Sequence, residues 1–276
     1  MAEGTLFVVA TPIGNMEDMT FRAIETLKTA DVIAAEDTRH TVKLLNHFEI
    51  KNKLMSFHEH SDVSRRDEIL DMLRQGMKVA LVSDAGTPLI SDPGAELVAA
   101  AVQNGIRVIP IPGASAVVTA LSASGLLKDG FVFEGFLPAD NKARKAALLR
   151  IQSETRTMVL YEAPHRIEKT LEILKDTLGA ERPMVLAREM TKVYEEFIRG
   201  SIGETLVRIK DKPLKGEMVL ILAGAEKEEK IVTDEEITAE LKSWMGKGKT
   251  KKDAVGLTAS SLEILKNRVY QISLKL

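Results

Sequence analysis

The chain has 276 residues, of which 45% are hydrophobic and 28% are charged. This length and balance suffice for two domains with separate cores, so we do not expect disorder. Because no apolar run approaches about 18 residues and no basic, apolar leader is present, we expect neither a membrane span nor a signal peptide. The absence of cysteine excludes disulfides, thiolate metal sites and cysteine nucleophiles, and it fits a reducing cytoplasm.

Charge is distributed unevenly along the chain. The net charge is −2, yet residues 245–276 carry seven Lys and Arg residues against Asp253 and Glu263, a net charge of +5, which leaves −7 for the preceding 244 residues. An anionic partner for the tail would explain this cluster, and so would an ordinary solvated face.

The first 112 residues predict five alternations of strand and helix, the pattern of a parallel, doubly wound α/β domain. Continuous apolar runs such as Thr5 to Ala10 and Val79 to Val82 are typical of strands buried on both faces. In such sheets ligands bind beyond the carboxyl ends of the strands. We expect helices over about residues 20–30, 38–48, 64–75 and 95–102.

Residues 82–94, Val-Ser-Asp-Ala-Gly-Thr-Pro-Leu-Ile-Ser-Asp-Pro-Gly, join a predicted strand to a predicted helix on that ligand side. Gly86 permits a positive φ or a close approach to a ligand, and Pro88 directs the chain out of the loop. Ser91 is the predicted N-cap of the following helix, with Pro93 just inside it. A ligand-binding loop and a well-capped strand-to-helix turn both fit this spacing.

Two polar clusters follow other strands on the same side. Residues 36–41, Glu-Asp-Thr-Arg-His-Thr, can position a polar substrate, although capping of the next helix by Asp37 or Thr38 explains part of the pattern. The His-Glu-His sequence at 58–60 is compatible with a metal site, but no third ligand has suitable spacing, so we expect no metal.

The second half predicts a mixed two-layer sheet. An alternating aromatic strand at 131–136 precedes strands at 157–161, 184–188, 195–200 and 218–222, with helices near 141–153, 165–177 and 202–209. Small residues at 113–121 begin a helix whose N-terminus can approach a ligand closely. We expect an N-terminal α/β domain at 1–114 and a second α/β domain at 115–226 that together form a cleft.

Residues 233–276 predict a helical C-terminal domain. Thr250 and Ser260 each begin a predicted capping box, Gly256 lies between the two, and Leu265, Val269, Ile272 and Leu276 mark one face of the last helix. Two short helices with a Gly turn and basic residues fit a helix-turn-helix element that contacts RNA backbone. A small helical cap that only packs on the protein is the alternative.

Several motifs together resemble one family, the bacterial small-subunit ribosomal RNA 2′-O-methyltransferases that modify the ribose of a cytidine, in the tetrapyrrole-methylase superfamily. The resemblance covers about residues 4–224 and keeps the motif order. The motifs are Ala-Thr-Pro-Ile-Gly-Asn (10–15), Ala-Glu-Asp-Thr-Arg (35–39), Ser-Phe-His-Glu-His (56–60), Ser-Asp-Ala-Gly-Thr-Pro (83–88), Pro-Gly-Ala-Ser-Ala (112–116), Tyr-Glu-Ala-Pro-His-Arg (161–166) and Ala-Arg-Glu-Met-Thr-Lys (187–192).

This resemblance implies S-adenosylmethionine bound in the interdomain cleft of a homodimer, with small-subunit rRNA or the assembled 30S subunit as acceptor. It departs from the wider superfamily at residues 83–86, where a Gly-Asp-Pro sequence is usual and this chain has Ser-Asp-Ala-Gly. The cofactor-binding residues that it implies are Pro12, Gly14, Asp84, Thr87, Ser115, Ala116, Tyr161, Ala187, Gly216 and Glu217.

Methyl transfer to a ribose hydroxyl needs alignment of the hydroxyl and a group that accepts its proton. Our catalytic candidates are Glu36, Asp37, Arg39, His58 and Glu59, and Arg39, His165 and Arg166 are the candidates for holding phosphates. Two other functions stay open at this point: a methylase acting on a tetrapyrrole or similar small molecule, and a non-catalytic RNA-binding module that uses its cofactor pocket for structure or regulation.

Overall fold

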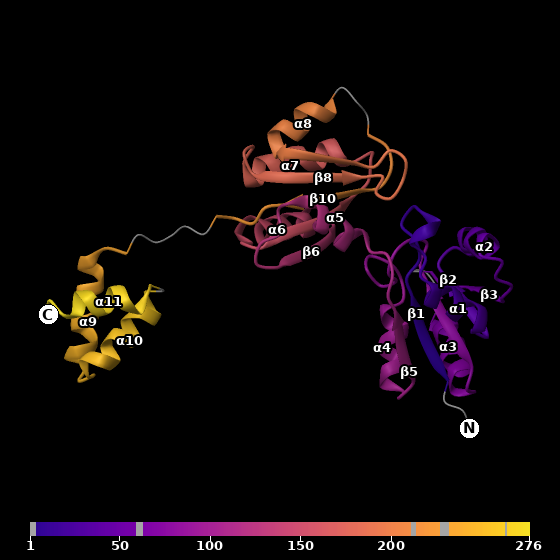
Figure 1. The fold of residues 1–276 in the computed structure, drawn as a ribbon, viewed down its shortest axis with the longest axis horizontal. Coiled ribbons are helices and arrows are strands. Elements are labelled where there is room, and N and C mark those ends of the chain that lie inside the picture. Colours follow the sequence, from indigo (N-terminus) through magenta and orange to yellow (C-terminus); the bar gives the residue numbers. More distant parts are fainter. Residues whose placement is uncertain (1–3, 59–62, 211–213, 227–231, 263) are drawn as a thin grey trace. The chain divides into compact units, whose positions relative to one another are not determined.

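The computed structural model describes residues 4–58, 63–210, 214–226, 232–262 and 264–276. The chain forms two compact units, Met1–Ala225 and Glu226–Leu276. The larger unit contains two five-stranded sheets, and the described part of the smaller unit contains helices only (Figure 1). The structure thus has the predicted α/β fold with two sheets and a helical C-terminal appendage. The predicted domain boundary at residue 114, inside the larger unit, stays a prediction.

The first sheet is fully parallel, with strand order β3-β2-β4-β1-β5. Apolar side chains on both faces of the strands explain why helices cover both sides. Helices α1 and α2 pack on one face through Leu27 and Leu44, and α3 and α4 pack on the other through Ile69 and Leu97. The elements are β1 (Thr5–Val9), a 3-10 helix (Met16–Asp18), α1 (Phe21–Thr29), β2 (Val32–Ala35), α2 (Thr38–His47), β3 (Leu54–Ser56), α3 (Val63–Arg74), β4 (Lys78–Val82), α4 (Ala95–Gln103) and β5 (Arg107–Ile111).

The order of the strands in this sheet reverses between β1 and β4. These strands are neighbours, with Leu6 paired to Val79, but the helices that follow them lie on opposite faces of the sheet. The loops beyond their carboxyl ends meet at Thr11 and Gly86, at the position where ligands generally bind in doubly wound sheets. The loop after β4 is the stretch that the sequence singled out.

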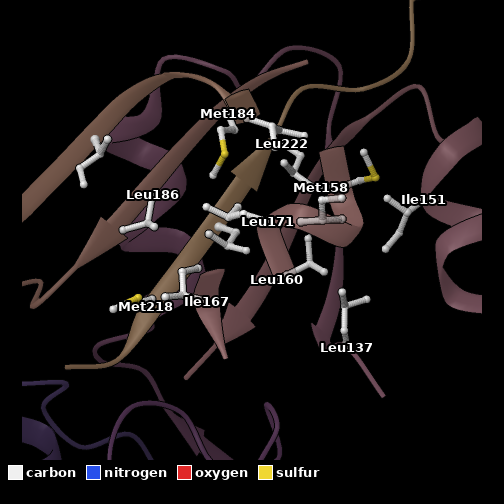
Figure 2. Packing of buried hydrophobic residues seen from close by; sticks show 14 of the residues in the cluster. Leu137, Ile151, Met158, Leu160, Ile167, Leu171, Met184, Leu186, Met218 and Leu222 are labelled. Carbon is white, nitrogen blue, oxygen red and sulfur yellow. The ribbon is translucent and has the colours of Figure 1, made fainter. Parts of the chain in front are cut away.

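The second sheet is mixed, with strand order β6-β7-β10-β8-β9, and only the β6–β7 pair is parallel. Successive side chains of each strand alternate between two cores. Met158 and Leu160 face helices α6, α7 and α8, in the core that Figure 2 shows. Val159 faces α5 in the other core. The elements are α5 (Ala116–Ser124), β6 (Phe131–Phe136), α6 (Asn141–Ser153), β7 (Thr157–Glu162), α7 (Ile167–Leu178), β8 (Pro183–Arg188), β9 (Glu196–Ser201), α8 (Ile202–Lys210) and β10 (Met218–Leu222).

The smaller unit has its own apolar core and three helices in its described residues: α9 (Asp234–Gly246), α10 (Lys251–Ser261) and α11 (Lys266–Ser273). Ile237, Val255 and Val269 bring one buried side chain from each helix to this core. Thr233 and Glu236 form a capping box at the start of α9, and the Thr250 side chain accepts the Asp253 amide at the start of α10.

Three details of the C-terminal prediction were wrong. Gly256 lies inside α10, because one helical glycine costs only about 1 kcal/mol relative to alanine and the buried face of α10 outweighs it. Ser260 belongs to the last turn of α10 and does not begin a capping box, since α11 starts with Leu265 as its N-cap. Leu265 and Leu276 are exposed, so only Val269 and Ile272 of the predicted apolar face pack in the core.

The predicted N-cap at Ser91 was also wrong. Helix α4 begins at Ala95 with Gly94 as its N-cap, at a φ of +122°. A Cβ on Gly94 would lie 2.7 Å from Leu81 Cδ2, so the chain passes too close to β4 for any other residue. This close packing sets the start of α4, and Ser91 is left in the loop with a φ of +65°.

Candidate active site

A cavity of about 400 Å³ lies within the larger unit, beyond the carboxyl ends of the first sheet and beside strands β7 and β10 of the second. Its volume is in the range of small-molecule and cofactor sites. The lining residues are Ile13, Glu36, Asp84, Ala85, Gly86, Thr87, Ile90, Ser91, Asp92, Ser115, Ala116, Phe136, Tyr161, Glu162, Ala163, Pro164, Glu189, Met190, Lys192, Glu217, Met218 and Val219.

Hydrogen bonds between loops fix the floor of this cavity. The Thr11 amide donates to the Gly86 carbonyl at 2.8 Å, and the Gly86 amide donates to the Thr11 carbonyl at 3.0 Å. Thr87 Oγ1 donates to the Ala114 carbonyl at 3.1 Å. Gly86 has a φ of +81°, and a Cβ there would lie 3.3 Å from Ile13 Cγ2, so glycine suits this crossing on both counts.

Acidic residues from two neighbouring strands are joined at the cavity. The Asp84 amide donates to Glu36 Oε2 at 3.3 Å, and the Asp37 amide donates to Asp84 Oδ1 at 3.1 Å. Both bonds connect the loop after β2 with the loop after β4, strands that are paired in the sheet. Glu36 and Asp84 line the cavity as a result.

Asp37 caps α2 and at the same time holds Arg39. Its Oδ1 accepts the Arg39 amide at 2.8 Å and Nε at 3.0 Å, and its Oδ2 accepts from the guanidinium at 2.7 Å. The hydrogen bonds from Arg39 lower the pKa of Asp37 to about 2. Asp37 is therefore a firmly ionised carboxylate beside an exposed guanidinium.

The opposite wall comes from the second sheet. Burial raises the pKa of Tyr161 to about 12, and the Asp92 carboxylate adds to this shift. The ring packs edge-on against Phe133 and Phe136, with centroid distances of 4.9 and 5.6 Å. Tyr161 is therefore a neutral phenol on an aromatic wall.

Glu162, next along β7, has a buried side chain that Arg166 and Thr170 hold. The Arg166 Nε lies 3.3 Å from Glu162 Oε1, and its NH2 donates to the Leu137 carbonyl at 2.8 Å. A buried carboxylate needs such a partner, since an unpaired buried charge is costly. The Arg166 guanidinium is thus engaged inside the protein.

Two glycines allow chain segments to meet beside the cavity. Gly216 has a φ of +81°, and a Cβ there would lie 2.8 Å from Glu189 Cγ and overlap its carboxylate. A Cβ on Gly14 would lie 2.8 Å from Lys192 Cγ and Thr191 Oγ1. The turn at 189–192 therefore packs against the loop after β1 on one side and against the start of β10 on the other.

Asp92 is a cavity residue that the sequence reasoning did not single out. Burial raises its pKa to about 6; the Ser83 hydroxyl opposes this shift, and the carboxylates of Glu36, Asp84 and Glu217 add to it. The one feature of the sequence that could have indicated a role for Asp92 is its position in the loop after β4, two residues before Gly94. Its neighbours are far away in the sequence, so spacing alone could not reveal its environment.

The side chains that line the cavity suit a ligand that carries positive charge and also has apolar groups. Among the described residues it contains six carboxyl side chains and one lysine, Lys192, which pairs with Glu189 at 3.1 Å. Ile13, Ala116 and Met190 supply apolar wall between the acids. A ligand that carries positive charge and an aromatic or aliphatic portion would satisfy both kinds of wall.

Comparisons with known proteins show the family and the fold of this chain. The family described as Tetrapyrrole (Corrin/Porphyrin) Methylases matches residues 5–206. A protein of Synechocystis sp. named Ribosomal RNA small subunit methyltransferase I is 49% identical over 274 residues, which cover 99% of this chain and 98% of that protein. The Bacillus subtilis protein of the same name is 45% identical, covering 97% and 93%.

The chain belongs to the ribosomal RNA small subunit methyltransferase I family of the tetrapyrrole methylases. The crystal structure of uroporphyrin-III C-methyltransferase from Thermus thermophilus complexed with S-adenosylhomocysteine has the same fold. Its TM-score is 0.57 at 19% identity, and the match covers 80% of this chain and 97% of that chain.

The structure of this methyltransferase family member brings many of the predicted site residues to one cavity. Of the predicted catalytic residues, Glu36 lines the cavity. The predicted cofactor residues that line the cavity are Asp84, Thr87, Ser115, Ala116, Tyr161 and Glu217.

Other predicted residues adjoin the cavity without lining it. Pro12 and Gly14 flank the lining residue Ile13, Gly216 precedes Glu217, and Ala187 is buried in the core cluster against which Tyr161 packs. Asp37, Arg39, His58 and His165 lie outside the lining, and Glu59 and His60 lie outside the described residues. The binding and catalytic roles of all these residues stay predictions.

In the described ranges, no helix of this methyltransferase family member is long and apolar enough to cross a membrane. Within the same ranges, no three His, Asp or Glu side chains are grouped so as to hold a metal ion.

Proposed function

We propose that this protein is an S-adenosylmethionine-dependent methyltransferase that acts on the ribose 2′-hydroxyl of a cytidine in small-subunit rRNA. The observation that carries the proposal is the carboxylate-lined cavity, in a chain that matches named rRNA methyltransferases over nearly its full length. The family name supports an rRNA acceptor. The ribose oxygen and the cytidine are the finer part of the proposal, drawn from the sequence motifs.

The cavity fits the cofactor by charge and by shape. S-adenosylmethionine carries a sulfonium and an ammonium, and Asp84 and Glu217 offer carboxylates to positive groups. Apolar side chains such as Ile13, Ala116 and Met190 offer a surface for its nucleoside part. When bound, it supplies a methyl group already activated for displacement by an oxygen nucleophile.

The tight packing around the cavity supports roles for residues that do not line it. Gly216 lets β10 begin against Glu189, and Gly14 lets the first loop approach Lys192. Pro12 fixes the direction of the same loop, and Ala187 lies in the core cluster against which Tyr161 packs. These residues would shape the site, while Thr87, Ser115 and Ala116 would offer polar and small groups to the cofactor.

The chain must also align the hydroxyl and take up its proton. Glu36 lines the cavity and stays a candidate for this role, as do His58 and Glu59. Asp37 is a poor proton acceptor because its pKa is about 2, so we assign it a positioning role through Arg39. Arg39, with an exposed guanidinium beside the same strand end, is suited to grip a phosphate.

Basic residues of the C-terminal unit are candidates for RNA backbone contacts. Lys251 and Lys252 occupy the first turn of α10, where the helix dipole disfavours cations, so a helix-stabilising role does not explain them. An RNA phosphate placed there would meet both lysines and the free amides of the helix start. Arg166 is less suited to phosphates than the sequence suggested, since Glu162 and Leu137 engage its guanidinium.

A homodimer and a cytoplasmic location belong to the same proposal. They follow from the family resemblance and from an rRNA substrate in a bacterial cell, and light scattering of the purified protein tests the dimer.

The direct test is transfer of labelled methyl from S-adenosylmethionine to three acceptors offered in parallel: small ribosomal subunits from cells that lack this protein, the naked rRNA, and a tetrapyrrole. We expect label in the RNA of one or both ribosomal acceptors and none in the tetrapyrrole. Label in the tetrapyrrole alone would instead assign a small-molecule methylase. Cofactor binding without transfer to any RNA would assign a non-catalytic RNA-binding module.

A further inference from the structure

The loop that carries Asp92 has an unusual backbone. Gly86, Leu89, Ser91 and Gly94 have φ values of +81°, +75°, +65° and +122°. Leucine and serine rarely adopt such angles, which cost free energy and persist where the surrounding structure enforces them, most often at functional sites. The strained part of this loop, residues 86–94, places Asp92 on the cavity wall, and Asp84 lines the cavity from just before it.

Packing on both sides holds Asp92 in place. On one side, a Cβ on Gly135 of β6 would lie 3.3 Å from Ser91 Oγ, so the loop contacts the second sheet. On the other side, Gly94 packs against Leu81 of β4. The residues on either side of Asp92 thus contact both sheets, which anchors the backbone of the loop at this position.

Four of the other five acids of the cavity, all except Glu217, are held by structural partners. Glu36 accepts the Asp84 amide, and Asp84 in turn accepts the Asp37 amide. Glu162 pairs with Arg166, and Glu189 pairs with Lys192. A carboxylate held in this way is a weaker proton acceptor than one without a cation or an amide donor.

Asp92 has a different environment. In the described part of the chain it forms no ion pair with a basic side chain, and the charged or titratable groups that face it are Glu36, Asp84, Glu217 and Tyr161. Ser83, directly after β4, is buried, and its hydroxyl has no other partner among the described residues. It lies close enough to Asp92 to lower the pKa of that carboxyl against the effect of burial, so Ser83 can orient the carboxylate by donating to it.

We propose that Asp92 is the proton acceptor for the ribose 2′-hydroxyl, a role that rests on the proposed methyl transfer. As the bond from O2′ to the methyl carbon forms, the carbon–sulfur bond of the donor breaks and its electron pair stays on sulfur. The proton of O2′ passes to a carboxylate oxygen of Asp92 and then to solvent. Ser83 is a positioning residue in this step.

The test compares Asp92→Asn and Asp92→Glu with Asp176→Asn, a substitution of an exposed aspartate on α7 that serves as the matched control. Single-turnover methyl transfer to the acceptor RNA is measured across pH, and calorimetry measures the affinity for S-adenosylmethionine. We expect Asp92→Asn to slow transfer by about 10²-fold to 10⁴-fold with cofactor affinity changed less than threefold. Asp92→Glu should recover part of the rate, and Asp176→Asn should match the wild type.

A second measurement needs no cofactor and no turnover. Carboxyl-carbon NMR of the ligand-free protein should show one aspartate that titrates near pH 6, and Asp92→Asn should remove this resonance. Absence of such a group from the wild type would contradict the environment on which the proposal stands.

Two kinetic outcomes would overturn the role of Asp92 without affecting the proposed function. One is wild-type transfer by Asp92→Asn. The other is a loss of cofactor affinity as large as the loss of rate, which would make Asp92 a cofactor-binding residue. If the wild-type protein itself methylates no RNA, the proposed function fails instead, so the two failures are distinguishable.

Discussion

The backbone amide of Asp37 donates a 3.1 Å hydrogen bond to the carboxylate of Asp84. The Asp84 amide in turn donates a hydrogen bond to the Glu36 carboxylate. The loops after the paired strands β2 and β4 therefore hold each other in position. Asp84 therefore has two duties at once: it fixes the loop that carries Glu36 and Asp37, and it presents negative charge to the cavity.

Substitutions at Asp84 should separate these two duties. In Asp84→Asn the amide oxygen still accepts from Asp37, so we expect a loss of cofactor affinity of about tenfold or more with little change in stability. Asp84→Ala removes the acceptor as well and should lower the free energy of unfolding by about 1–3 kcal/mol. Calorimetry and urea unfolding measure the two effects. Equal loss of stability in both variants would contradict this division.

Gly216→Ala should disrupt the start of β10. The added methyl overlaps the Glu189 carboxylate, and the φ of +81° is strained for alanine. We expect a loss of about 1–3 kcal/mol in stability together with weaker cofactor binding. Gly105→Ala is the matched control, because Gly105 has a φ of +69° with open space around it. A control that matched Gly216→Ala in both measurements would show that strain alone, rather than the contact with Glu189, is responsible.

Arg39→Ala should weaken RNA binding and leave cofactor binding intact. The Asp37–Arg39 pair is exposed, so its loss should change stability by less than about 1 kcal/mol. Removal of one phosphate contact should lower the slope of log affinity against log salt by about 0.7 to 0.9. Arg74→Ala, which removes an exposed arginine paired with Asp71 on α3, is the control. An unchanged salt slope in Arg39→Ala would rule out the phosphate contact.

Asp92 should make the ligand-free protein less stable as pH rises. Its folded pKa is about 6 against 3.8 for an ordinary aspartate, so between these values the unfolded chain has lost the proton that the folded protein keeps. Stability falls through this window and the loss is complete above it. Since Asp92 is partly exposed, we expect Asp92→Asn to gain about 1–2 kcal/mol over the wild type at pH 7 and almost nothing at pH 3.5. Urea unfolding at both pH values checks this, and an equal gain at both would contradict it.

The strands, and hence the edge of the sheet at which the cavity lies, could be predicted from sequence because buried parallel strands leave continuous apolar runs, as at Val79 to Val82. Contacts between residues that are remote in the sequence leave no comparable pattern in the sequence. The start of α4 depends on the contact between Gly94 and Leu81, and the environment of Asp92 depends on Glu36, Glu217 and Tyr161, all remote in sequence.

The candidate site was predictable in part for the same reason. Residues within motifs, such as Asp84 and Thr87, reach the cavity because they directly follow a strand. Gly14 and Gly216 act through contacts with the turn at 189–192, and only the folded chain reveals those contacts.

The most direct test of the central claim is the chemical position of the transferred methyl group. Small-subunit RNA labelled by the purified protein is digested with alkali to nucleoside monophosphates and, where a methylated 2′-oxygen blocks cleavage, to dinucleotides, and the products are identified by mass spectrometry. We predict label in an alkali-resistant dinucleotide that contains 2′-O-methylcytidine. Label on a base, with every phosphodiester bond sensitive to alkali, would contradict ribose methylation while leaving an rRNA methyltransferase in place.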